Sequence, residues 1–535
     1  MTNLLEALSD NICIDRDKCI FCGDCVERCV LDNIRLQLSP CRQACPLGVN
    51  CHGYVKLLAD GEGLKAMEVL RETLPFPGIL GRICSQPCED TCHRNVTEGA
   101  PVAIRALKRY LADRHGSEVS DPDIPGDSGR RVAVIGSGPA GMMTAYELRR
   151  FGHGVTVYEA DDQPGGMLRW AIPEFRLPGD VLKQELDLLR RMGVEFSCGT
   201  QVGRDVSLDK LKGQHDAVVV CTGAGEPARL GIDGEDMEGI YHGLPFLRAV
   251  REGTPHRVGS KVLVVGGGNV AVDAAQTAFR LGAQDVRMVC LESREEMPAF
   301  TWELAGALGE GVKAECSWGP LRFDTRDGKV AGLEFQRCVR VFNENGAFDP
   351  AFDQCQTIRF DADTVIIAVG QKAGAPLLEG PDMVKGGLVA VDPVTLETAE
   401  NGLFAAGDAV SGPSSVVEAM AQGREAAISV HRMLSGEPLR YGRAYEGPYI
   451  RDFPIDVSGA IQRERVAIPT VGRGTQGDFR ELEASLDDDA ARREAERCYS
   501  CGVPVGHYRT CWFCLPCEVV CPTEALYVEV PYLLR

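Results

Sequence analysis

The sequence predicts an α/β fold with two parallel sheets, a small helical domain on their N-terminal side and short cysteine-rich segments at both ends. Two stretches predict the sheets. Residues 130–160 and 262–292 each read as a strand, a glycine-rich turn, a helix and a second strand that leads to an acidic residue. The 23 cysteines predict the rest, since eleven precede residue 93 and six lie between residues 498 and 521.

The first of these stretches carries a turn of the phosphate-binding type, with the spacing G-x-G-x-x-G. It consists of Gly136, Ser137, Gly138, Pro139, Ala140 and Gly141. In such a turn the first glycine allows the tight bend, the second lets the backbone approach a pyrophosphate, and the third lets the helix pack closely on the strand. The helix N-terminus stabilises the phosphate charge. Glu159 ends the second strand 18 residues after Gly141, where a carboxylate can accept bonds from ribose hydroxyls. We therefore expect a bound dinucleotide here.

Length and charge limit the classes of function. A chain of 535 residues is too long for one hydrophobic core, so three or four domains are expected. Its net charge of −20 disfavours nucleic acids and anionic membranes as partners, because both bind basic surfaces. No apolar run approaches the ~18 residues of a membrane span, and the N-terminus has no basic region before an apolar core. We expect no transmembrane helix, no signal peptide and a cytoplasmic location.

Residues 1–36 are expected to form a ferredoxin-like 4Fe-4S segment. Disulfides would suit a small secreted domain, whereas this chain is large and its cysteines cluster at short spacings. The spacing C-x2-C-x2-C-x3-C is met by Cys19, Cys22, Cys25 and Cys29. This spacing is typical of a [4Fe–4S] cluster, and the alternative, zinc, is normally held by two paired CxxC units. Val30 stands where bacterial ferredoxins usually have proline, and no second such motif follows directly, so the ferredoxin fold here is expected to be partial.

Residues 37–120 are expected to form an α-helical iron–sulfur domain. Six cysteines occur in two groups that a helical stretch at 54–74 separates, and a single one could be a core residue but not all six. The expected cluster ligands among them are Cys41, Cys45, Cys84, Cys88 and Cys92, with Cys51 beside them. Further on, Ile104, Leu107 and Leu111 share one helical face, which predicts packing against a core.

These residues carry a resemblance to a known family. The strings are CRQACPLGV, GRICSQPCEDTC, PVAIRALKRY, GSGPAGMMTAYELRRFGHGVTVYEA, PGGMLRWAIPEFRLP, GGGNVAVDAAQTAFRLGA, SREEMPA and FAAGDAVSGPSSVVEAMAQGREAA. Over roughly residues 37–435 the chain resembles the small-subunit family of glutamate synthase, which also includes the N-terminal half of dihydropyrimidine dehydrogenase and bifurcating transhydrogenase flavoproteins. The small subunits have a further CxxC shortly before the first of these cysteines, which this chain lacks. The resemblance implies FAD in the first nucleotide unit and a nicotinamide domain inserted into the flavin domain.

The second unit has the same design. A strand at 262–265 precedes the turn, a helix runs to Leu281, and the strand at 286–291 leads to Glu292, 21 residues after Ala271. The expected cofactor-binding residues are Gly266, Gly268, Asn269, Ala271, Glu292 and Arg294. Two Rossmann-type units in one chain are what a flavin and a nicotinamide nucleotide together require. Relatives that use NADPH typically have two arginines at this strand end. Glu292 would repel a 2′-phosphate, so NADH is favoured, while Arg294 keeps NADPH as the alternative.

Further flavin contacts are expected on either side of the second unit. A buried strand at 216–223 ends in a glycine turn, and the resemblance makes it the close of the first flavin segment. The expected residues are Gly166, Gly223, Gly407 and Asp408. In the family, the motif at 402–408 places Asp408 on the ribityl chain and directs the following helix, from Ser415, at the isoalloxazine. The middle of the chain has no redox CxxC, so electrons are expected to leave the flavin through clusters.

The C-terminal region is expected to divide into a polar connector and a second ferredoxin-like segment. The connector contains an acidic run at 486–489, interpreted as a solvated face. The segment contains Cys498, Cys501, Cys511, Cys514, Cys517 and Cys521, the last followed by Pro522. Six cysteines cannot supply two all-cysteine cubanes, which need eight. The expected division is 1–36, 37–120, 130–255 (first FAD segment), 256–374 (NAD(P)H domain), 375–439 (second FAD segment), 440–495 (connector) and 496–535.

The sequence therefore predicts a flavin iron–sulfur oxidoreductase with FAD, NAD(H) and about three or four 4Fe-4S clusters. No side chain is needed as a general acid or base for hydride transfer, so no catalytic residue is named. A protein redox partner in a hetero-oligomer is expected, because the layout is similar to the flavin subunits that serve dissimilatory sulfite reductase, 2-oxoacid:ferredoxin oxidoreductase or benzoyl-CoA reduction. The alternatives are a glutamate synthase small subunit, an electron-bifurcating subunit and a non-catalytic cluster-bearing assembly module.

Overall fold

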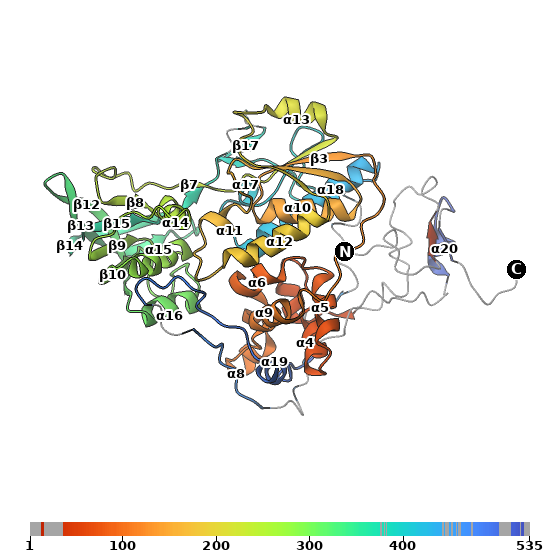
Figure 1. The fold of residues 1–535 in the computed structure, drawn as a ribbon, viewed down its shortest axis with the longest axis horizontal. Coiled ribbons are helices and arrows are strands. Elements are labelled where there is room, and N and C mark those ends of the chain that lie inside the picture. Colours follow the sequence, from red (N-terminus) through yellow and green to blue (C-terminus); the bar gives the residue numbers. More distant parts are fainter. Residues whose placement is uncertain are drawn as a thin grey trace, which may run out of the picture.

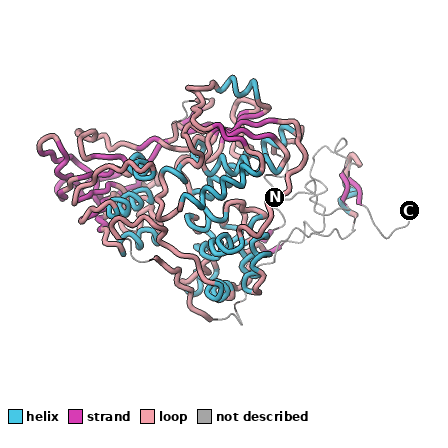
Figure 2. Tube along the Cα trace, in the orientation of Figure 1, coloured by secondary structure: helices cyan, strands magenta, loops and turns pink. Residues whose placement is uncertain are grey.

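The computed structural model contains two parallel sheets side by side, with a helical domain packed below them (Figure 1). Figure 2 shows how the magenta strands gather in the two sheets and the cyan helices surround them. The structure describes residues 12–14, 36–374, 377–378, 380, 382–440, 443, 449–450, 453–455, 457, 462–471, 475–501, 515–524 and 526–528.

The first sheet is all-parallel, with the strand order β19-β6-β3-β4-β5. Its strands are β3 (Arg131–Ile135), β4 (Gly154–Tyr158), β5 (Glu195–Ser197), β6 (Ala217–Val220) and β19 (Leu403–Ala405). Side chains alternate along β3. Val132 and Val134 join the core formed by α10 (Pro139–Arg150), α12 (Gly179–Arg191) and α18 (Val416–Leu434). Ala133 and Ile135 join the opposite core, which Leu211 of α13 (Leu208–Gln214) completes. Burial on both faces explains the continuous apolar strands.

The second sheet is also parallel and has the order β11-β10-β9-β15-β8. Its strands are β8 (Ile240–His242), β9 (Lys261–Val265), β10 (Asp285–Val289), β11 (Lys313–Glu315) and β15 (Thr364–Ile367). One face packs on α14 (Gly243–Arg251), α15 (Asn269–Arg280) and α16 (Thr301–Gly309). The other face packs on an antiparallel sheet made of β12 (Trp318–Arg326), β13 (Lys329–Phe342) and β14 (Phe348–Asp361).

The second sheet is inserted between β6 and β19 of the first, which confirms the predicted topology. The chain crosses over and returns through an antiparallel pair, β7 (Glu226–Pro227) and β16 (Gln371–Lys372). A small hairpin, β17 (Val384–Lys385) and β18 (Leu388–Val389), precedes β19. The expected boundary between residues 255 and 256 was placed too late, because β8 pairs in parallel with β15 in the second sheet.

The predicted helical domain is present. Its elements are α3 (Pro40–Ala44), α4 (Cys51–Ala59), α5 (Gly63–Arg71), α6 (Pro77–Ile83), α7 (Pro87–Asp90), α8 (His93–Glu98) and α9 (Ile104–His115). The predicted face of Ile104, Leu107 and Leu111 is buried, with at most 3% exposure. The domain and one face of the first sheet share a continuous apolar core.

A further helix belongs to this domain although it lies far along the chain. Helix α19 (Asp488–Ala495) packs on α4 and α9, and Figure 1 shows it in blue among the red and orange helices. The expected connector at 440–495 is therefore wrong for its final stretch. In the acidic run Leu486 is buried, Asp487 caps α19, and Asp488 accepts a bond of 2.9 Å from the Tyr110 hydroxyl.

The two ends of the chain are paired. Strand β1 (Ile12–Ile14) is antiparallel to β21 (Leu526–Val528), which follows α20 (Pro516–Val520), and β2 (Leu36–Gln37) is parallel to β20 (Tyr449–Ile450). The segments 1–36 and 496–535, expected as separate units, are thus joined by a strand pair. In the described part of the chain, no helix is both long and apolar enough to cross a bilayer.

The helical domain meets the first sheet's helices at a carboxylate. Glu185 on α12 accepts bonds from the backbone N–H of Gly78 (2.5 Å) and Ile79 (3.2 Å) at the start of α6. Burial raises the pKa of Glu185 to about 8, and these two bonds oppose the rise. Charging this group therefore costs free energy in the folded chain.

This contact predicts a loss of stability with rising pH. The folded pKa lies above that of the unfolded chain, so the free energy of unfolding should fall between about pH 4.5 and pH 8, by a few kcal/mol at most. Glu185→Gln cannot ionise and should lack this fall, which chemical denaturation at pH 5 and pH 8 measures. The exposed Glu68→Gln on α5 is the matched control. Equal pH dependence in Glu185→Gln and the wild type would contradict the assignment.

Candidate functional site

A cleft of about 1510 Å³ lies between the two nucleotide-type sheets and is larger than the ~300–1,000 Å³ of an ordinary small-ligand pocket. Most of the predicted cofactor-binding residues line it. They are Gly136, Gly138, Pro139, Ala140, Glu159, Gly166, Gly223, Gly266, Gly268, Asn269, Glu292, Gly407 and Asp408. Gly141 and Ala271 lie behind it, in the packing of helix on strand. Arg294 is exposed and does not belong to the lining.

The first glycine of each turn is required by the backbone. Gly136 has φ +104°, and a Cβ there would lie 2.3 Å from the carbonyl oxygen of Cys221. Gly266 has φ +138°, and a Cβ there would lie 2.2 Å from the carbonyl oxygen of Ala368. Each turn therefore packs tightly against the end of the neighbouring strand, β6 in the first sheet and β15 in the second. This contact holds the rest of the turn at the carboxyl end of the sheet.

The second glycine of each turn faces open space. Gly138 and Gly268 are the N-caps of α10 and α15, and a Cβ at either position would meet nothing within 4 Å. A helix N-terminus with free space above it is suited to a phosphate. Gly141 is needed for packing, since its Cβ would lie 2.0 Å from the carbonyl oxygen of Gly136. The residues thus fit two dinucleotides, one in each turn.

The two acidic strand ends face these turns. The Glu159 carboxylate accepts from Ser137 N (3.0 Å), from the Ser137 hydroxyl and from Asp161 N (2.9 Å). A carboxylate has about four acceptor positions, so one remains for a ribose hydroxyl. Glu292 reaches over the second turn, because its Oε2 lies 3.0 Å from the position of a Cβ on Gly267. Arg294 instead directs its guanidinium at the Met297 sulfur, 3.9 Å away.

The motif at 402–408 packs against the first glycine-rich turn. A Cβ on Gly407 (φ +75°) would lie 2.8 Å from the Ala140 Cβ. Asp408 begins α17 (Asp408–Ser411) and accepts from the backbone N–H (3.1 Å) and hydroxyl (2.8 Å) of Ser414. Burial raises the pKa of Asp408. Gly166, the N-cap of α11 (Met167–Trp170), also approaches the turn, since its Cβ would lie 2.9 Å from the Gly138 Cα.

A buried ion-pair group at the cleft was missed by sequence reasoning. Arg176, in the loop before α12, donates to Asp273 on α15 (2.7 Å) and to Glu303 on α16. It therefore ties the first nucleotide domain to the second. Burial alone would lower the pKa of Arg176, but the two carboxylates raise it above its usual value, while burial raises the pKa of Glu303 to about 7. The carboxylates lie about 100 residues or more from Arg176 in sequence, so no local pattern indicated the group.

The cysteines form two groups in the helical domain. One small cavity is lined by Cys41, Cys51, Cys92, Cys498 and Cys501. Burial raises the pKa of Cys498 and Cys501 to about 12, and the neighbouring thiols of Cys41 and Cys92 add to the rise. The expectation that Cys498 and Cys501 belong to a separate C-terminal segment is therefore wrong, because they lie against the helical domain.

The second group surrounds a buried lysine. Lys108 on α9 donates to the Leu80 carbonyl (3.5 Å). Burial alone would lower its pKa, but the thiols of Cys84, Cys88 and Cys45 raise it. Cys51 lies beside both Cys41 and Cys88, and its interaction with Cys41 lowers the pKa of Cys41 to about 7.

Among the described residues no three His, Cys, Asp or Glu side chains converge closely enough to hold one metal ion. A single zinc ion needs all its ligands within one coordination sphere, whereas a cubane spreads four thiolates over four irons. The five thiols that line the small cavity are donors of the type that a 4Fe-4S cluster requires. Cys19, Cys22, Cys25, Cys29, Cys511 and Cys514 lie outside the described residues. Cys517 lies in α20, and Cys521 is half-buried with its sulfur 3.8 Å from the Thr523 hydroxyl.

Two family profiles match the chain. The profile of the pyridine nucleotide-disulphide oxidoreductases matches residues 130–423, and that of dihydropyrimidine dehydrogenase domain II, 4Fe-4S cluster, matches residues 5–119. The structure is also similar to that of FprA from Mycobacterium tuberculosis (His57Gln mutant), with a TM-score of 0.51 at 18% identity over 57% of this chain and 85% of that chain. This likeness shows the shared fold of the two nucleotide domains.

Several known proteins match most of the chain. The NADP(+)-dependent formate dehydrogenase subunit beta of Moorella thermoacetica is 35% identical over 86% of this chain and 70% of its own length. The NADPH-Fe(3+) oxidoreductase subunit beta of Geobacter sulfurreducens is 31% identical over 86% and 75%. The glutamate synthase [NADPH] small chain of Mycobacterium tuberculosis is 34% identical over 74% and 86%. The chain therefore belongs to the pyridine nucleotide-disulphide oxidoreductase family, in the group of FAD-dependent iron–sulfur oxidoreductases that includes the glutamate synthase small chains.

Proposed function

We propose that the chain is the electron-transfer subunit of a larger oxidoreductase and moves electrons between NADH and a protein partner through FAD and 4Fe-4S clusters. The observation that carries this proposal is the cleft lined by both nucleotide turns, because a flavin and a nicotinamide must meet for hydride transfer. FAD would accept the two electrons of a hydride together and release them one at a time, and clusters can carry single electrons. The chain's own residues bind, orient and shield these groups.

The helical domain supplies a route away from the cleft. Ile83 and Ser85 line the cleft, and Cys84 stands between them in the chain. The group around Lys108 therefore adjoins the flavin end of the cleft. Through Cys51 it is connected to the cavity of Cys41. We propose that the electron path follows this order, from the cleft to the Cys84 group and on to the Cys41 cavity.

The partner is proposed to be a protein in a hetero-oligomer. Two relatives that each match 86% of this chain are called beta subunits, of a formate dehydrogenase and of an NADPH-Fe(3+) oxidoreductase. The described cysteines are free thiols rather than disulfides, which favours a reducing compartment such as the cytoplasm. With the cysteine runs outside the described residues included, three or four clusters are proposed.

NADH is proposed as the nicotinamide because Glu292 lines the cleft and Arg294 does not. The three relatives named above carry NADP(+) or NADPH in their names, so the two nucleotides must be compared directly. A carboxylate at the ribose end would meet the 2′-phosphate of NADPH without a partner, and such a mispaired group costs on the order of 1–3 kcal/mol.

The test is the ratio of kcat/KM for NADH and NADPH with an artificial acceptor. We expect the wild type to prefer NADH and Glu292→Arg to shift the ratio toward NADPH by about 10- to 100-fold. Arg294→Ala is the matched control and should change the ratio little. A wild type that prefers NADPH would show that Glu292 does not select the nucleotide. If neither NADH nor NADPH bleached the bound flavin under anaerobic conditions, the proposed function itself would be rejected.

A further inference from the structure

We infer that one 4Fe-4S cluster is held by cysteines from both ends of the chain, namely Cys41, Cys92, Cys498 and Cys501. The inference rests on the proposed function and deepens it, since it names the ligands of one cluster on the electron path. These four residues line the same cavity, which lies inside the helical domain.

The four ligands come from three segments of the chain, and Cys498 and Cys501 share the one that follows α19. Cys41 lies in the first turn of α3, and Cys92 is the N-cap of α8. Cys498 follows α19, where its N–H bonds to the Ala495 carbonyl at 3.1 Å. Turns that approach one cavity from several sides can place four thiolates at four corners, as a cubane requires. Cys51, at the start of α4, completes the wall of the cavity.

A buried ion pair fixes the position of the C-terminal cysteines. Glu494 and Arg497 have fully buried side chains and bond to each other at 2.7 Å. Glu494 also accepts from Ala103 N at 2.8 Å. Arg497 donates to the carbonyls of Ala100 at 2.7 Å and Pro101 at 3.1 Å. A buried pair is stable only when its other hydrogen bonds are made, and here they are made with the segment that follows Cys92.

Arg94 and Tyr499, which lie close to the proposed ligands in the chain, are also held by polar contacts. Arg94 is 1% exposed and donates to the carbonyl oxygen of Arg497, 403 residues away in the sequence. Its guanidinium also bonds to Glu98 at 2.7 Å and lies 4.2 Å from the centre of the Tyr499 ring. The Tyr499 hydroxyl in turn donates to Glu98 at 2.5 Å. These contacts therefore join the residues next to Cys92 to the residues next to Cys498.

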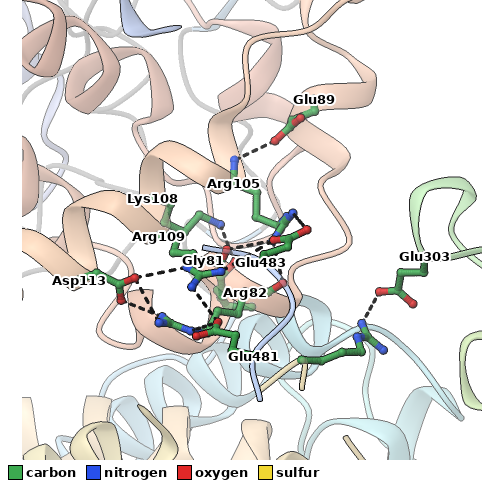
Figure 3. A network of polar contacts seen from close by, with 12 residues as sticks. Gly81, Arg82, Glu89, Arg105, Lys108, Arg109, Asp113, Glu303, Glu481 and Glu483 are labelled. Carbon is green, nitrogen blue, oxygen red and sulfur yellow. Dashed lines mark hydrogen bonds and ion pairs between the residues drawn. The ribbon is translucent and has the colours of Figure 1, made fainter. Parts of the chain in front are cut away.

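The segment before α19 is held on the same domain. Figure 3 shows Glu481 and Glu483 beside arginines of α6 and α9. Arg82 and Arg109 reach Glu481 at 2.8 and 2.9 Å, and Arg105 reaches Glu483 at 2.8 Å. The chain from residue 481 to Cys501 is thus seated on the helical domain along its length, which leaves its two cysteines in the cavity.

The shared ligand set is tested by combining variants. In Cys41→Ala or Cys498→Ala, the anaerobically purified full-length protein should lose about four irons and four sulfides per chain and one electron paramagnetic resonance signal after reduction. The double variant Cys41→Ala/Cys498→Ala should lose no more than either single variant, because both remove the same cluster. Cys92→Ala combined with Cys501→Ala gives the same comparison through the other two ligands. Cys355→Ala, an exposed cysteine on β14, should retain all iron.

A double variant that loses twice as much iron as the single variants would overturn the inference, because the cysteines would then belong to two clusters. Unchanged iron in Cys498→Ala and in Cys501→Ala would overturn it as well. Flavin content and bleaching by NADH are measured on the same samples. These two readouts depend on the cleft and not on this cavity, so failure of the ligand assignment is distinguishable from failure of the proposed function.

Discussion

Gly138→Val is expected to yield a folded protein without FAD, and Gly268→Val a yellow protein whose flavin NADH no longer reduces. At both positions the backbone is in a region that valine can adopt, and the added side chain would enter open space above a helix N-terminus. That space is where a pyrophosphate would lie. We expect at least a 100-fold fall in flavin occupancy or in reduction rate, equivalent to about 3 kcal/mol. Absorbance of the purified protein and stopped-flow reduction measure the two effects.

The matched control is Gly306→Val. This glycine lies in α16, a Cβ there also meets nothing within 4 Å, and it does not line the cleft. It should keep its flavin and its rate of reduction. Stoichiometric FAD in Gly138→Val would mean that the first turn holds another group.

Arg497→Met is expected to produce the largest loss of stability outside the cleft. It leaves the fully buried Glu494 carboxylate without its cation and the backbone carbonyls of Ala100 and Arg463 without a side-chain donor. The Pro101 carbonyl loses one of its two donors and keeps the bond from Arg465. Breaking one side of a buried pair costs about 3–5 kcal/mol. The free energy of unfolding from chemical denaturation should fall by this amount, with earlier loss of iron on titration.

Two further variants separate the ion pair from other causes. Arg497→Met/Glu494→Gln removes the buried charge and should recover some of the loss. Arg492→Met, which changes an exposed arginine on α19, the helix that carries Glu494, should change little. If Arg497→Met unfolded at the denaturant concentration of the wild type, the segment 481–501 would not depend on this pair.

Local patterns predicted the nucleotide domains well. In both units the glycine spacing, the apolar strand and the terminal acid lie within about 30 residues, and each has a direct steric or electrostatic reason. The apolar strands are buried on both faces of the sheet, as Val132 and Ala133 show. The domain boundary was missed because β8 is only three residues long, and its partner β15 lies more than 100 residues further on. Short apolar runs give little sequence signal.

The cysteine site shows the same limit. Spacing between neighbouring cysteines predicted that the helical domain holds clusters, but it could not show that Cys498 faces Cys41. A weaker signal was present at 488–495, where Ala490, Ala491, Glu494 and Ala495 share a buried face. An amphipathic helix needs a surface to cover, which argues against a free connector. The ion pairs of Arg176 had no such signal.

The seating of residues 481–501 on the helical domain also sets an order of events during biosynthesis. Residues 37–120 leave the ribosome early and would ordinarily fold as a unit before the rest is made. Here their buried surface is completed by α19, and their cavity by Cys498, both of which are translated hundreds of residues later. The nascent chain must therefore carry an open helical domain through synthesis of both nucleotide domains. The four inferred cluster ligands are all present only after residue 501 has been translated, so we expect this cluster to be completed at the end of synthesis.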